Sequence, residues 1–362
     1  MSIAKTSKIY IAGHKGLVGS ALWNNLKKKG YTNLIGKTHK ELDLLDGLAV
    51  RAFFEQEKPE CVFLAAAHVG GIMANNTYRA DFIYKNMQIQ QNVIGESFRT
   101  GVKKLLFLGS TCIYPRDAKQ PIKEEYLLTG PLEYTNEPYA IAKIAGLKMC
   151  ESFNLQYGTN YIAVMPTNLY GPNDNFDLET SHVLPAMIRK IYLAHCLRND
   201  DWEAITRDLN HLPVGSIDGD SSKETIEKEL SRQGIYSDRV ELWGTGTPLR
   251  EFLWSEEMAD ACVYIMENVD FKDTFDDNNT EVRNCHINIG TGKEITIRNL
   301  AELIIETIGY DGELIFDKSK PDGTMRKLTD VSKLNSLGWT HRIDIQEGIP
   351  RLYEWYLSSK AN

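Results

Sequence analysis

Strand-like and helix-like segments alternate along the first half of the chain, and this alternation limits the fold more than any other feature. The strand-like segments are 8–12, 33–35, 61–67, 104–108 and 161–165, and the helix-like segments are 17–29, 81–100 and 139–157. The run 61–67 is apolar throughout, which is typical of a strand buried on both faces. The alternation predicts an α/β fold built on a doubly wound parallel sheet.

The alternation weakens after Gly171 and stops between 195 and 238. That stretch holds ten acidic residues against five Lys or Arg, yet Trp202, Ile205 and Leu209 share one helical face. We therefore expect an ordered acidic insertion at about 195–238. A chain of 362 residues is long enough for two domains. The expected domains are a cofactor domain of 1–175 plus about 239–268, and a smaller mixed α/β substrate domain of about 176–238 plus 269–362.

The charge and the cysteines exclude several classes of protein. A net charge of −8 argues against a general nucleic-acid binder. No apolar run approaches the about 20 residues that span a bilayer, and the first residues lack the apolar core of a secretory signal. The six cysteines are scattered without a Cys-x-x-Cys pair, which favours reduced thiols over a zinc site. We expect a cytoplasmic protein without metal, nucleic-acid or membrane partners.

A glycine-rich loop follows the first strand and opens the first helix. Glycines let backbone N–H groups approach a pyrophosphate, and a helix N-terminus favours its negative charge. The spacing is Gly-x-x-Gly-x-x-Gly rather than Gly-x-Gly-x-x-Gly. This loop predicts dinucleotide binding on a Rossmann fold, through Gly13, His14, Lys15, Gly16, Leu17, Val18 and Gly19.

The residues after the second strand favour NADP(H) over NAD. NAD sites place a carboxylate there for the ribose hydroxyls, but the segment 36–40 has none. Lys15, His39 and Lys40 are cations suited to a 2′-phosphate, although a solvated basic loop is the alternative. Asp43 either contacts the adenine or caps the next helix.

Tyr139 and Lys143 are spaced four residues apart, so they lie on one face of a helix. A nearby ammonium favours the phenolate, so we expect Lys143 to lower the pKa of Tyr139. Ser110 follows a buried strand, where doubly wound sheets carry their sites. Together with the glycine loop, these three residues resemble the extended short-chain dehydrogenase/reductase superfamily, most of whose members act on nucleotide sugars.

Longer segments resemble the GDP-L-fucose synthase family within that superfamily. They are 69–76, 109–115, 136–143, 165–172, 181–183, 243–252 and 320–324. The resemblance covers nearly the whole chain except about 195–238. It implies a two-step reaction on GDP-4-keto-6-deoxy-D-mannose, in which C3 and C5 are epimerised and the C4 ketone is then reduced by NADPH.

The resemblance also implies roles for individual residues. Cys112 and His182 match the base and acid of the epimerisation, although a packed thiol and a capping or surface histidine are the alternatives. Tyr139 would protonate the C4 oxygen, Ser110 would bond to the ketone, and Lys143 would hold the nicotinamide ribose. Further cofactor contacts are expected at Leu108, Gly109, Ser110, Lys143, Pro166, Thr167, Asn168, Leu169 and His182.

Recognition of GDP is implied for Lys190, Trp243, Arg250 and Asp322, with lysine at 190 where the family more usually has arginine. Core packing is the alternative for Trp243, and a salt bridge to Glu251 or another carboxylate is the alternative for Arg250. The family is usually homodimeric, so we expect the helices at about 81–100 and 139–157 to form the interface, unless their apolar faces cover the sheet.

Three rival functions remain open. A 4,6-dehydratase would carry a carboxylate beside Thr111, and Cys112 and Ile113 follow instead. A 4-epimerase retains its NAD and needs neither Cys112 nor His182. A noncatalytic dinucleotide sensor tends to lose the tyrosine or the lysine, and this chain has both.

Overall fold

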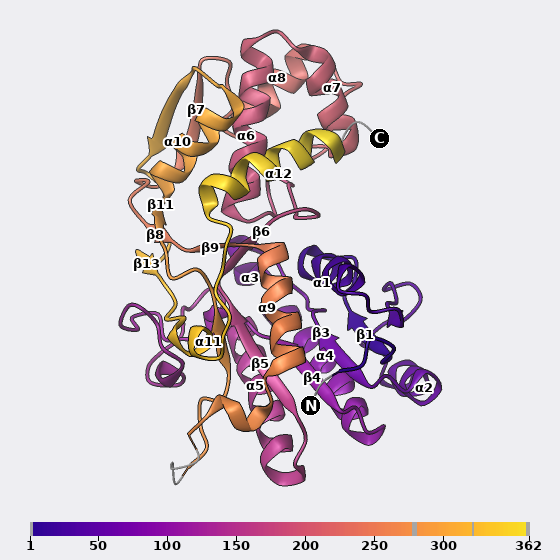
Figure 1. The fold of residues 1–362 in the computed structure, drawn as a ribbon. Coiled ribbons are helices and arrows are strands. Elements are labelled where there is room, and N and C mark those ends of the chain that lie inside the picture. The colour runs from indigo at the N-terminus through magenta and orange to yellow at the C-terminus, as the bar shows by residue number, and fades with distance from the viewer. Residues whose placement is uncertain (1–2, 277–280, 321, 360–362) are drawn as a thin grey trace. The chain divides into compact units, whose positions relative to one another are not determined.

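A computed structural model describes residues 3–276, 281–320 and 322–359 (Figure 1). The chain forms two compact units. The first unit comprises Met1–Asn173, Glu251–Gly292 and Leu328–Ile343, and the second comprises Asp174–Arg250, Lys293–Lys327 and Asp344–Asn362.

The first unit is built on a six-stranded sheet, which confirms the predicted α/β fold. Its strands are β1 (Ile9–Ala12), β2 (Leu34–Ile35), β3 (Cys61–Leu64), β4 (Lys104–Leu108), β5 (Tyr161–Pro166) and β10 (Ile287–Ile289). They lie in the order β10-β5-β4-β3-β1-β2, and every neighbouring pair is parallel. The strand order reverses between β1 and β3, and a doubly wound sheet opens its ligand crevice at such a reversal.

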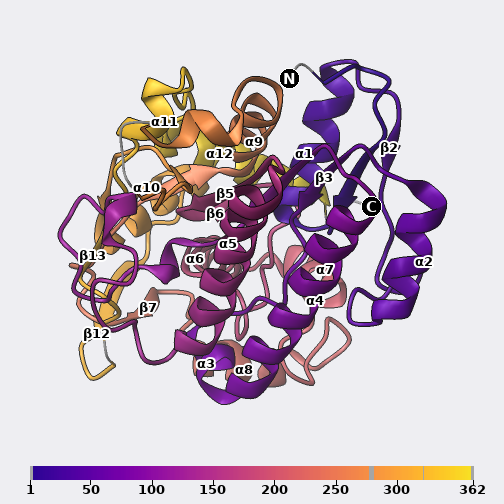
Figure 2. The ribbon, with the colours of Figure 1, turned by 90° about the horizontal axis from the view of Figure 1, so that it is seen from below.

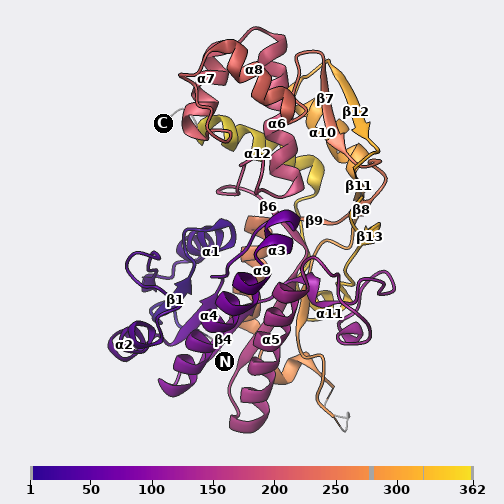
Figure 3. The same ribbon diagram turned by 180° about the vertical axis from the view of Figure 1, so that it is seen from behind.

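Helices cover both faces of this sheet. One face carries α1 (Leu17–Lys28) and α9 (Ser255–Asn268), which pack on one buried cluster (Figure 1). The other carries α2 (Gly47–Glu57), α4 (Arg79–Arg99) and α5 (Glu137–Tyr157), which pack on a second cluster (Figure 3). Helices α4 and α5 run side by side (Figure 2). With both faces covered, the strands are apolar throughout rather than alternating.

The second unit combines helices with two small sheets. The helices are α6 (Val183–Arg198), α7 (Trp202–His211), α8 (Lys223–Arg232), α10 (Ile297–Ile308) and α12 (Ile345–Ser359). Strand β7 (Arg239–Trp243) pairs with β12 (Glu313–Asp317), while β8 (Leu249–Arg250) lies between β11 (Ile295–Thr296) and β13 (Arg326–Lys327).

The acidic stretch is ordered and packs a few buried side chains into the second unit. Helix α7 begins at an Asp201 cap, and α8 begins at a Ser222 cap. Asp208 of α7 is fully buried and accepts a hydrogen bond from Arg189 Nε on α6 at 2.9 Å. Tyr356 of α12 donates to the other Asp208 oxygen at 2.6 Å. The stretch is therefore part of the packing that holds α6.

The units divide the chain differently from the expected domains at three places. Residues 239–250 fall in the second unit because β7 pairs with β12 rather than with the large sheet. Residues 269–292 fall in the first unit because β10 extends the large sheet beside β5. The segment 328–343 also returns to the first unit. The first boundary, at Asn173, lies close to the expected residue 175.

Candidate active site

Ser110 and Cys112 lie on a tight turn at the carboxyl end of β4. A Cβ at Gly109 would come within 2.3 Å of Met165 Sδ, so a larger residue there would displace the Met165 side chain of β5. Ser110 then caps a short 3-10 helix, Thr111–Ile113, and its hydroxyl accepts from the Cys112 amide at 3.3 Å. Cys112 is buried. The turn therefore holds the serine and the cysteine at the edge where such sheets carry their sites.

The first turns of α5 bring Tyr139 and Lys143 to the same edge. Lys143 Nζ donates to the Leu108 carbonyl at 2.7 Å, which ties the helix to the end of β4. The same ammonium lies 5.7 Å from the centroid of the Tyr139 ring. Lys143 is 3% exposed and Tyr139 is half-buried. The helical spacing thus places both groups beside the Ser110 turn, as the sequence predicts.

Burial governs the electrostatics of this cluster. It lowers the pKa of Lys143 to about 8, and the nearby Cys112 acts in the opposite direction. Burial also raises the pKa of Tyr139, and Cys112 raises it further. The expectation that Lys143 lowers the pKa of Tyr139 is wrong here, because desolvation of the phenolate outweighs the neighbouring charge. Cys112, Tyr139 and Lys143 are close enough to influence one another's charge.

The glycine loop forms a close backbone cradle between β1 and β3. Gly13 has φ +85°, and a Cβ there would lie 2.9 Å from the Ala66 amide nitrogen. A Cβ at Gly19 would lie 2.0 Å from the Gly13 carbonyl oxygen. The N-cap of α1, Gly16, offers no side-chain cap, and the first turn has no acidic residue. The loop therefore fits a pyrophosphate, since N–H groups and a helix N-terminus meet there without a competing side chain.

The loop after β2 presents cations and ties up its carboxylate. Glu41 accepts from both the amide and the hydroxyl of Thr38 at 2.7 Å, and these bonds lower the pKa of Glu41. Lys15, His39 and Lys40 are exposed. These residues fit a 2′-phosphate, because the Glu41 carboxylate is already engaged by Thr38.

Asp43 is not the cap of the following helix. Asp46 caps α2 by accepting from the amides of Leu48 and Ala49. Asp43 instead accepts from the Leu45 amide at 2.9 Å and lies 3.5 Å from His39 Nδ1. Adenine contact is the alternative left for Asp43.

Pro166, Thr167, Asn168 and Leu169 leave β5 at the same carboxyl edge. The Thr167 amide donates to the Ile289 carbonyl at 3.0 Å, and Asn168 Nδ2 donates to the Glu251 carbonyl at 2.8 Å. Strand β6 (Asn168–Tyr170) then pairs with β9 (Phe252–Trp254). This segment is fixed to two further strands, as a cofactor wall requires.

Trp243, Arg250 and Asp322 lie in the second unit. Trp243 is 62% exposed, so the core-packing alternative is wrong. Asp322 accepts from the Thr245 amide at 2.9 Å and from its hydroxyl at 2.7 Å, which anchors the turn after β7. Burial lowers the pKa of Arg250, and the charge of Asp322 opposes that effect. An indole, a guanidinium and a carboxylate are thus presented by one unit.

Glu251 does not pair with Arg250 among the described residues, so Glu251 is not the carboxylate of a salt bridge, whereas the charge of Asp322 does act on Arg250. The fully buried Glu251 carboxylate accepts from the amides of Thr291, Gly292 and Thr329, at 2.6, 2.7 and 2.9 Å. These bonds tie together segments of the first unit. The Arg250 guanidinium donates instead to the Leu249 carbonyl at 2.8 Å.

Lys190 and His182 belong to α6. Lys190 Nζ donates to the Gln233 carbonyl at the end of α8 at 2.6 Å, and burial lowers the pKa of Lys190 to about 8. His182 occupies the N-cap position, but its side chain makes no capping bond and is exposed. The capping alternative for His182 is therefore wrong.

Three site neighbours escaped sequence reasoning. Tyr114, His286 and Asn288 are buried polar side chains that hydrogen-bond to one another behind the Ser110 turn. Their pairing joins segments far apart in the chain, so no local spacing indicates it.

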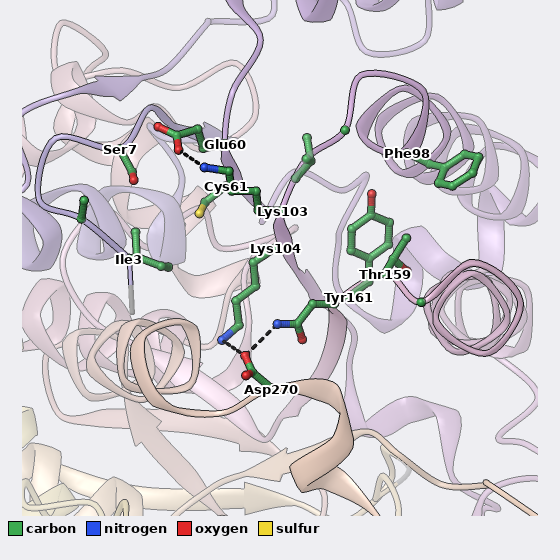
Figure 4. A pocket seen from close by; sticks show the side chains of 15 residues that line it. Ile3, Ser7, Glu60, Cys61, Phe98, Lys103, Lys104, Thr159, Tyr161 and Asp270 are labelled. Carbon is green, nitrogen blue, oxygen red and sulfur yellow. Dashed lines mark hydrogen bonds and ion pairs between the residues drawn. The ribbon is translucent and has the colours of Figure 1, made fainter. Parts of the chain in front are cut away.

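A pocket of about 550 Å³ lies at the opposite, amino edge of the sheet (Figure 4). Its lining includes the starts of β3, β4 and β5, together with Asp270 (Figure 4). Lys104 donates to Asp270 at 3.3 Å, and Asn160 donates to the same oxygen at 2.7 Å. None of the predicted site residues lines this pocket.

Within the described residues no cluster of His, Cys, Asp or Glu has the composition of a metal site. No helix among them has the length and apolar character to cross a bilayer.

Comparison with known proteins identifies the family. The model of the "NAD dependent epimerase/dehydratase family" matches residues 9–212 and 214–290, which include most of the acidic stretch. GDP-L-fucose synthase 1 of Arabidopsis thaliana is 49% identical over 358 residues, covering 99% of this chain and 95% of that protein. The expected gap in the resemblance at 195–238 is therefore wrong.

Solved structures agree with that assignment. A GDP-6-OMe-4-keto-L-xylo-heptose reductase from Campylobacter jejuni is 48% identical, with a TM-score of 0.92 over 99% of this chain and 100% of that one. A GDP-D-glycero-L-gluco-heptose synthase from the same organism, determined in the presence of NADPH, is 47% identical, with a TM-score of 0.90 over 98% and 99%. The chain therefore belongs to the NAD dependent epimerase/dehydratase family and, within it, to the GDP-L-fucose synthase family.

Proposed function

We propose that this protein is an NADPH-dependent GDP-L-fucose synthase, which epimerises GDP-4-keto-6-deoxy-D-mannose at C3 and C5 and then reduces C4. The observation that carries the proposal is the cluster of Cys112 with Tyr139 and Lys143 at the carboxyl end of β4. A thiol beside a tyrosine–lysine pair supplies a base for epimerisation and an acid for reduction at one ketone. The match to a plant GDP-L-fucose synthase over 99% of the chain supports the same substrate.

Tyr139 and Ser110 act on the C4 oxygen in both steps. During epimerisation their hydroxyls stabilise the enolate that forms when a proton leaves C3 or C5. During reduction Tyr139 gives its proton to the oxygen. Tyrosine is protonated at neutral pH even at its ordinary pKa of about 10, so Tyr139 holds the proton that the reduced oxygen takes up.

Cys112 and His182 exchange protons with carbon. We assign the base to Cys112 and the acid to His182. His182 has an exposed side chain with no capping bond, so its imidazole is available for proton transfer. The buried Cys112 lies close enough to Lys143 for their charges to interact, at the edge that also carries Ser110 and Tyr139.

The cradle of residues 13–19 and the cations Lys15, His39 and Lys40 would hold NADP(H). When bound, the reduced cofactor supplies the hydride for C4. Leu108, Gly109, the segment 166–169 and Lys143 would hold the nicotinamide half. A solved relative determined in the presence of NADPH supports this choice of cofactor.

Residues of the second unit would bind the nucleotide half of the substrate. Trp243 offers an exposed indole face for guanine. Arg250 and Lys190 offer cations to the diphosphate, and Asp322 anchors the turn that presents Trp243.

The proposal includes a cytoplasmic homodimer that joins through α4 and α5. Tyr84 and Met87 on α4 and Ile141, Leu155 and Tyr157 on α5 are exposed apolar or aromatic residues. None of the six cysteines, all within the described residues, forms a disulfide, in keeping with a reducing compartment.

Sedimentation of wild type and of Tyr84→Glu tests the interface formed by α4 and α5. Wild type should sediment as a dimer, and the carboxylate introduced by Tyr84→Glu should make that variant a monomer. A monomeric wild type would contradict the proposed interface.

A second candidate is reduction at C4 of a GDP-4-keto-heptose. The observation that favours it is the TM-score of 0.92 to a heptose reductase at 48% identity. The two candidates share the cofactor and the C4 chemistry, and they differ in the sugar and in the need for epimerisation.

One experiment separates these functions from the rivals. The protein is given GDP-4-keto-6-deoxy-mannose and NADPH in D₂O, and nicotinamide absorbance is followed together with deuterium at C3 and C5. A GDP-L-fucose synthase consumes NADPH stoichiometrically and incorporates deuterium at both carbons. A heptose reductase turns over only the corresponding GDP-4-keto-heptose. A 4-epimerase or a sensor leaves NADPH unchanged, and that result would refute the proposal.

A further inference from the structure

Tyr114 follows the turn that carries Ser110 and Cys112, and its hydroxyl is bonded to the last strand of the large sheet. Tyr114 is 3% exposed. Its Oη lies 2.6 Å from Asn288 Oδ1 and 2.9 Å from His286 Nε2. Asn288 is in the middle of β10, and His286 immediately precedes that strand. The active-site turn after β4 is therefore fastened across β5 to β10.

The surrounding bonds fix the direction of these two hydrogen bonds. Asn288 Nδ2 donates to the carbonyls of Ile122 and Asp330, at 3.0 and 3.2 Å. Asn288 Oδ1 is therefore an acceptor, so Tyr114 must donate its proton to it. The Tyr114 oxygen then accepts from His286 Nε2–H. Burial lowers the pKa of His286 to about 3, so the ring is neutral, and this bond selects the tautomer that carries its proton on Nε2.

The strand that receives Tyr114 is itself held on both sides. Glu124 Oε1 accepts from the Asn288 amide at 3.0 Å. Lys333 Nζ donates to the carbonyls of Asn284 and His286, each at 2.9 Å. Groups fixed by packed and hydrogen-bonded neighbours can hold a reacting side chain to within about half an ångström.

We propose that Tyr114 is a positioning residue. Its hydroxyl holds the turn that carries Ser110 and Cys112 against Asn288 and His286, and thereby sets where these two side chains meet the substrate. The inference rests on the proposed function, because it concerns the geometry of those two side chains. Tyr114 has its hydroxyl engaged on both sides, so it acts through the turn rather than on the sugar.

Tyr114→Phe tests the proposal by removing one oxygen atom. We expect kcat for deuterium exchange and for reduction to fall about tenfold to a hundredfold, since small misplacements cost that much. The KM for the sugar nucleotide should stay within about twofold, because the GDP-binding residues belong to the second unit. A merely structural role would lower the amount of active protein and leave kcat per active site unchanged.

Tyr161→Phe is the matched control. Tyr161 is 1% exposed, lies at the start of β5 on the amino edge, and its hydroxyl has no hydrogen-bond partner among the described residues. We expect wild-type kcat and KM from this variant. His286→Phe provides a second test that keeps the bond from Tyr114 to Asn288, and it should give a smaller loss of kcat than Tyr114→Phe.

Alkylation of Cys112 by iodoacetamide supplies a readout that needs no turnover. Cys112 is the most exposed of the six cysteines, at 9%, so mass spectrometry can follow its labelling separately. We expect severalfold faster labelling in Tyr114→Phe than in wild type or Tyr161→Phe. If wild type fails to process the keto-sugar, the proposed function fails while this comparison still stands. Equal labelling rates, or an unchanged kcat in Tyr114→Phe, would overturn the inference.

Discussion

The two edges of the six-stranded sheet each bury a lysine, but they satisfy its charge differently. Lys143 at the carboxyl edge and Lys104 at the amino edge are both 3% exposed. Lys104 forms an ion pair with Asp270 at 3.3 Å, whereas Lys143 bonds to the Leu108 carbonyl and has no carboxylate partner among the described residues. A buried cation with a counter-charge holds structure together, and one without it is costly and marks a site.

The carboxylate at the amino edge completes that contrast. The pKa of Asp270 falls to about 2 although burial opposes the fall, because it accepts hydrogen bonds that include those from Asn160 and Lys104. The buried charges at the amino edge therefore neutralise each other. The carboxyl edge leaves an ammonium near a thiol and a phenol, and both can exchange protons with a substrate.

The largest expected effect separates the cysteines of the two edges. Cys112→Ser should lower deuterium exchange at C3 and C5 by about 10²–10⁴-fold, because a serine hydroxyl is a far weaker base than a thiolate. Cys61 is 3% exposed and begins β3 at the amino edge. Cys61→Ser should retain wild-type exchange per folded molecule. Proton exchange is followed by mass spectrometry, and unchanged exchange in Cys112→Ser would remove the thiol from the mechanism.

Replacing the two lysines should move activity and stability in different ways. Lys143→Met should lower kcat/KM about 100-fold, because Tyr139 and the cofactor lose a cation. It should also raise the free energy of unfolding by about 1–3 kcal/mol, since a buried charge without a partner is removed. Lys104→Met should leave kcat/KM unchanged. It should lower the free energy of unfolding by about 1–2 kcal/mol, because Asp270 loses a partner.

Urea denaturation and steady-state kinetics on both variants check this pair. Destabilisation by Lys143→Met equal to that by Lys104→Met would show that the two edges do not differ in the way described. Loss of activity in Lys104→Met would show that the amino edge also serves the reaction.

A smaller effect concerns the cofactor phosphate. Lys15→Ala should raise the KM for NADPH about tenfold and leave that for NADH unchanged, because one charge-assisted contact is lost. Lys103→Ala is the control, since Lys103 pairs with Glu60 at the amino edge. Initial rates with each cofactor measure the difference. If the KM for NADH rose by the same factor, Lys15 would be assigned to the pyrophosphate rather than to the 2′-phosphate.

Local spacing predicted the carboxyl edge well. Glycines spaced for a turn, and Tyr139 and Lys143 spaced for one helix face, depend only on neighbours in the chain. The glycine cradle and the approach of Lys143 to β4 follow from those local patterns.

Long-range packing decided what the sequence did not predict. The sequence alone does not show that β10 joins the large sheet or that β7 joins the second unit, because strand pairing partners are chosen in space. The bonds of Tyr114 to Asn288 and of Glu251 to Thr291 and Thr329 depend on the same folding. The direction of the Tyr139 pKa shift was missed because desolvation has no signature in sequence spacing.

The smallest expected effect is the pH dependence of the lysine comparison. The pKa of Lys143 is lowered from 10.5 to about 8, so between these values the unfolded chain binds more protons than the folded one. The free energy of unfolding of wild type should therefore rise with pH in that window relative to Lys143→Met, by up to about 1.4 kcal/mol per pH unit. Below pH 8 the free energy of unfolding of wild type stays at its lowest relative to Lys143→Met, because Lys143 is charged in both the folded and the unfolded chain. Urea melts of both proteins from pH 7 to 10 measure this difference. A gap that stays constant over that range would mean that Lys143 titrates normally, and the contrast between the two edges would then lose its electrostatic basis.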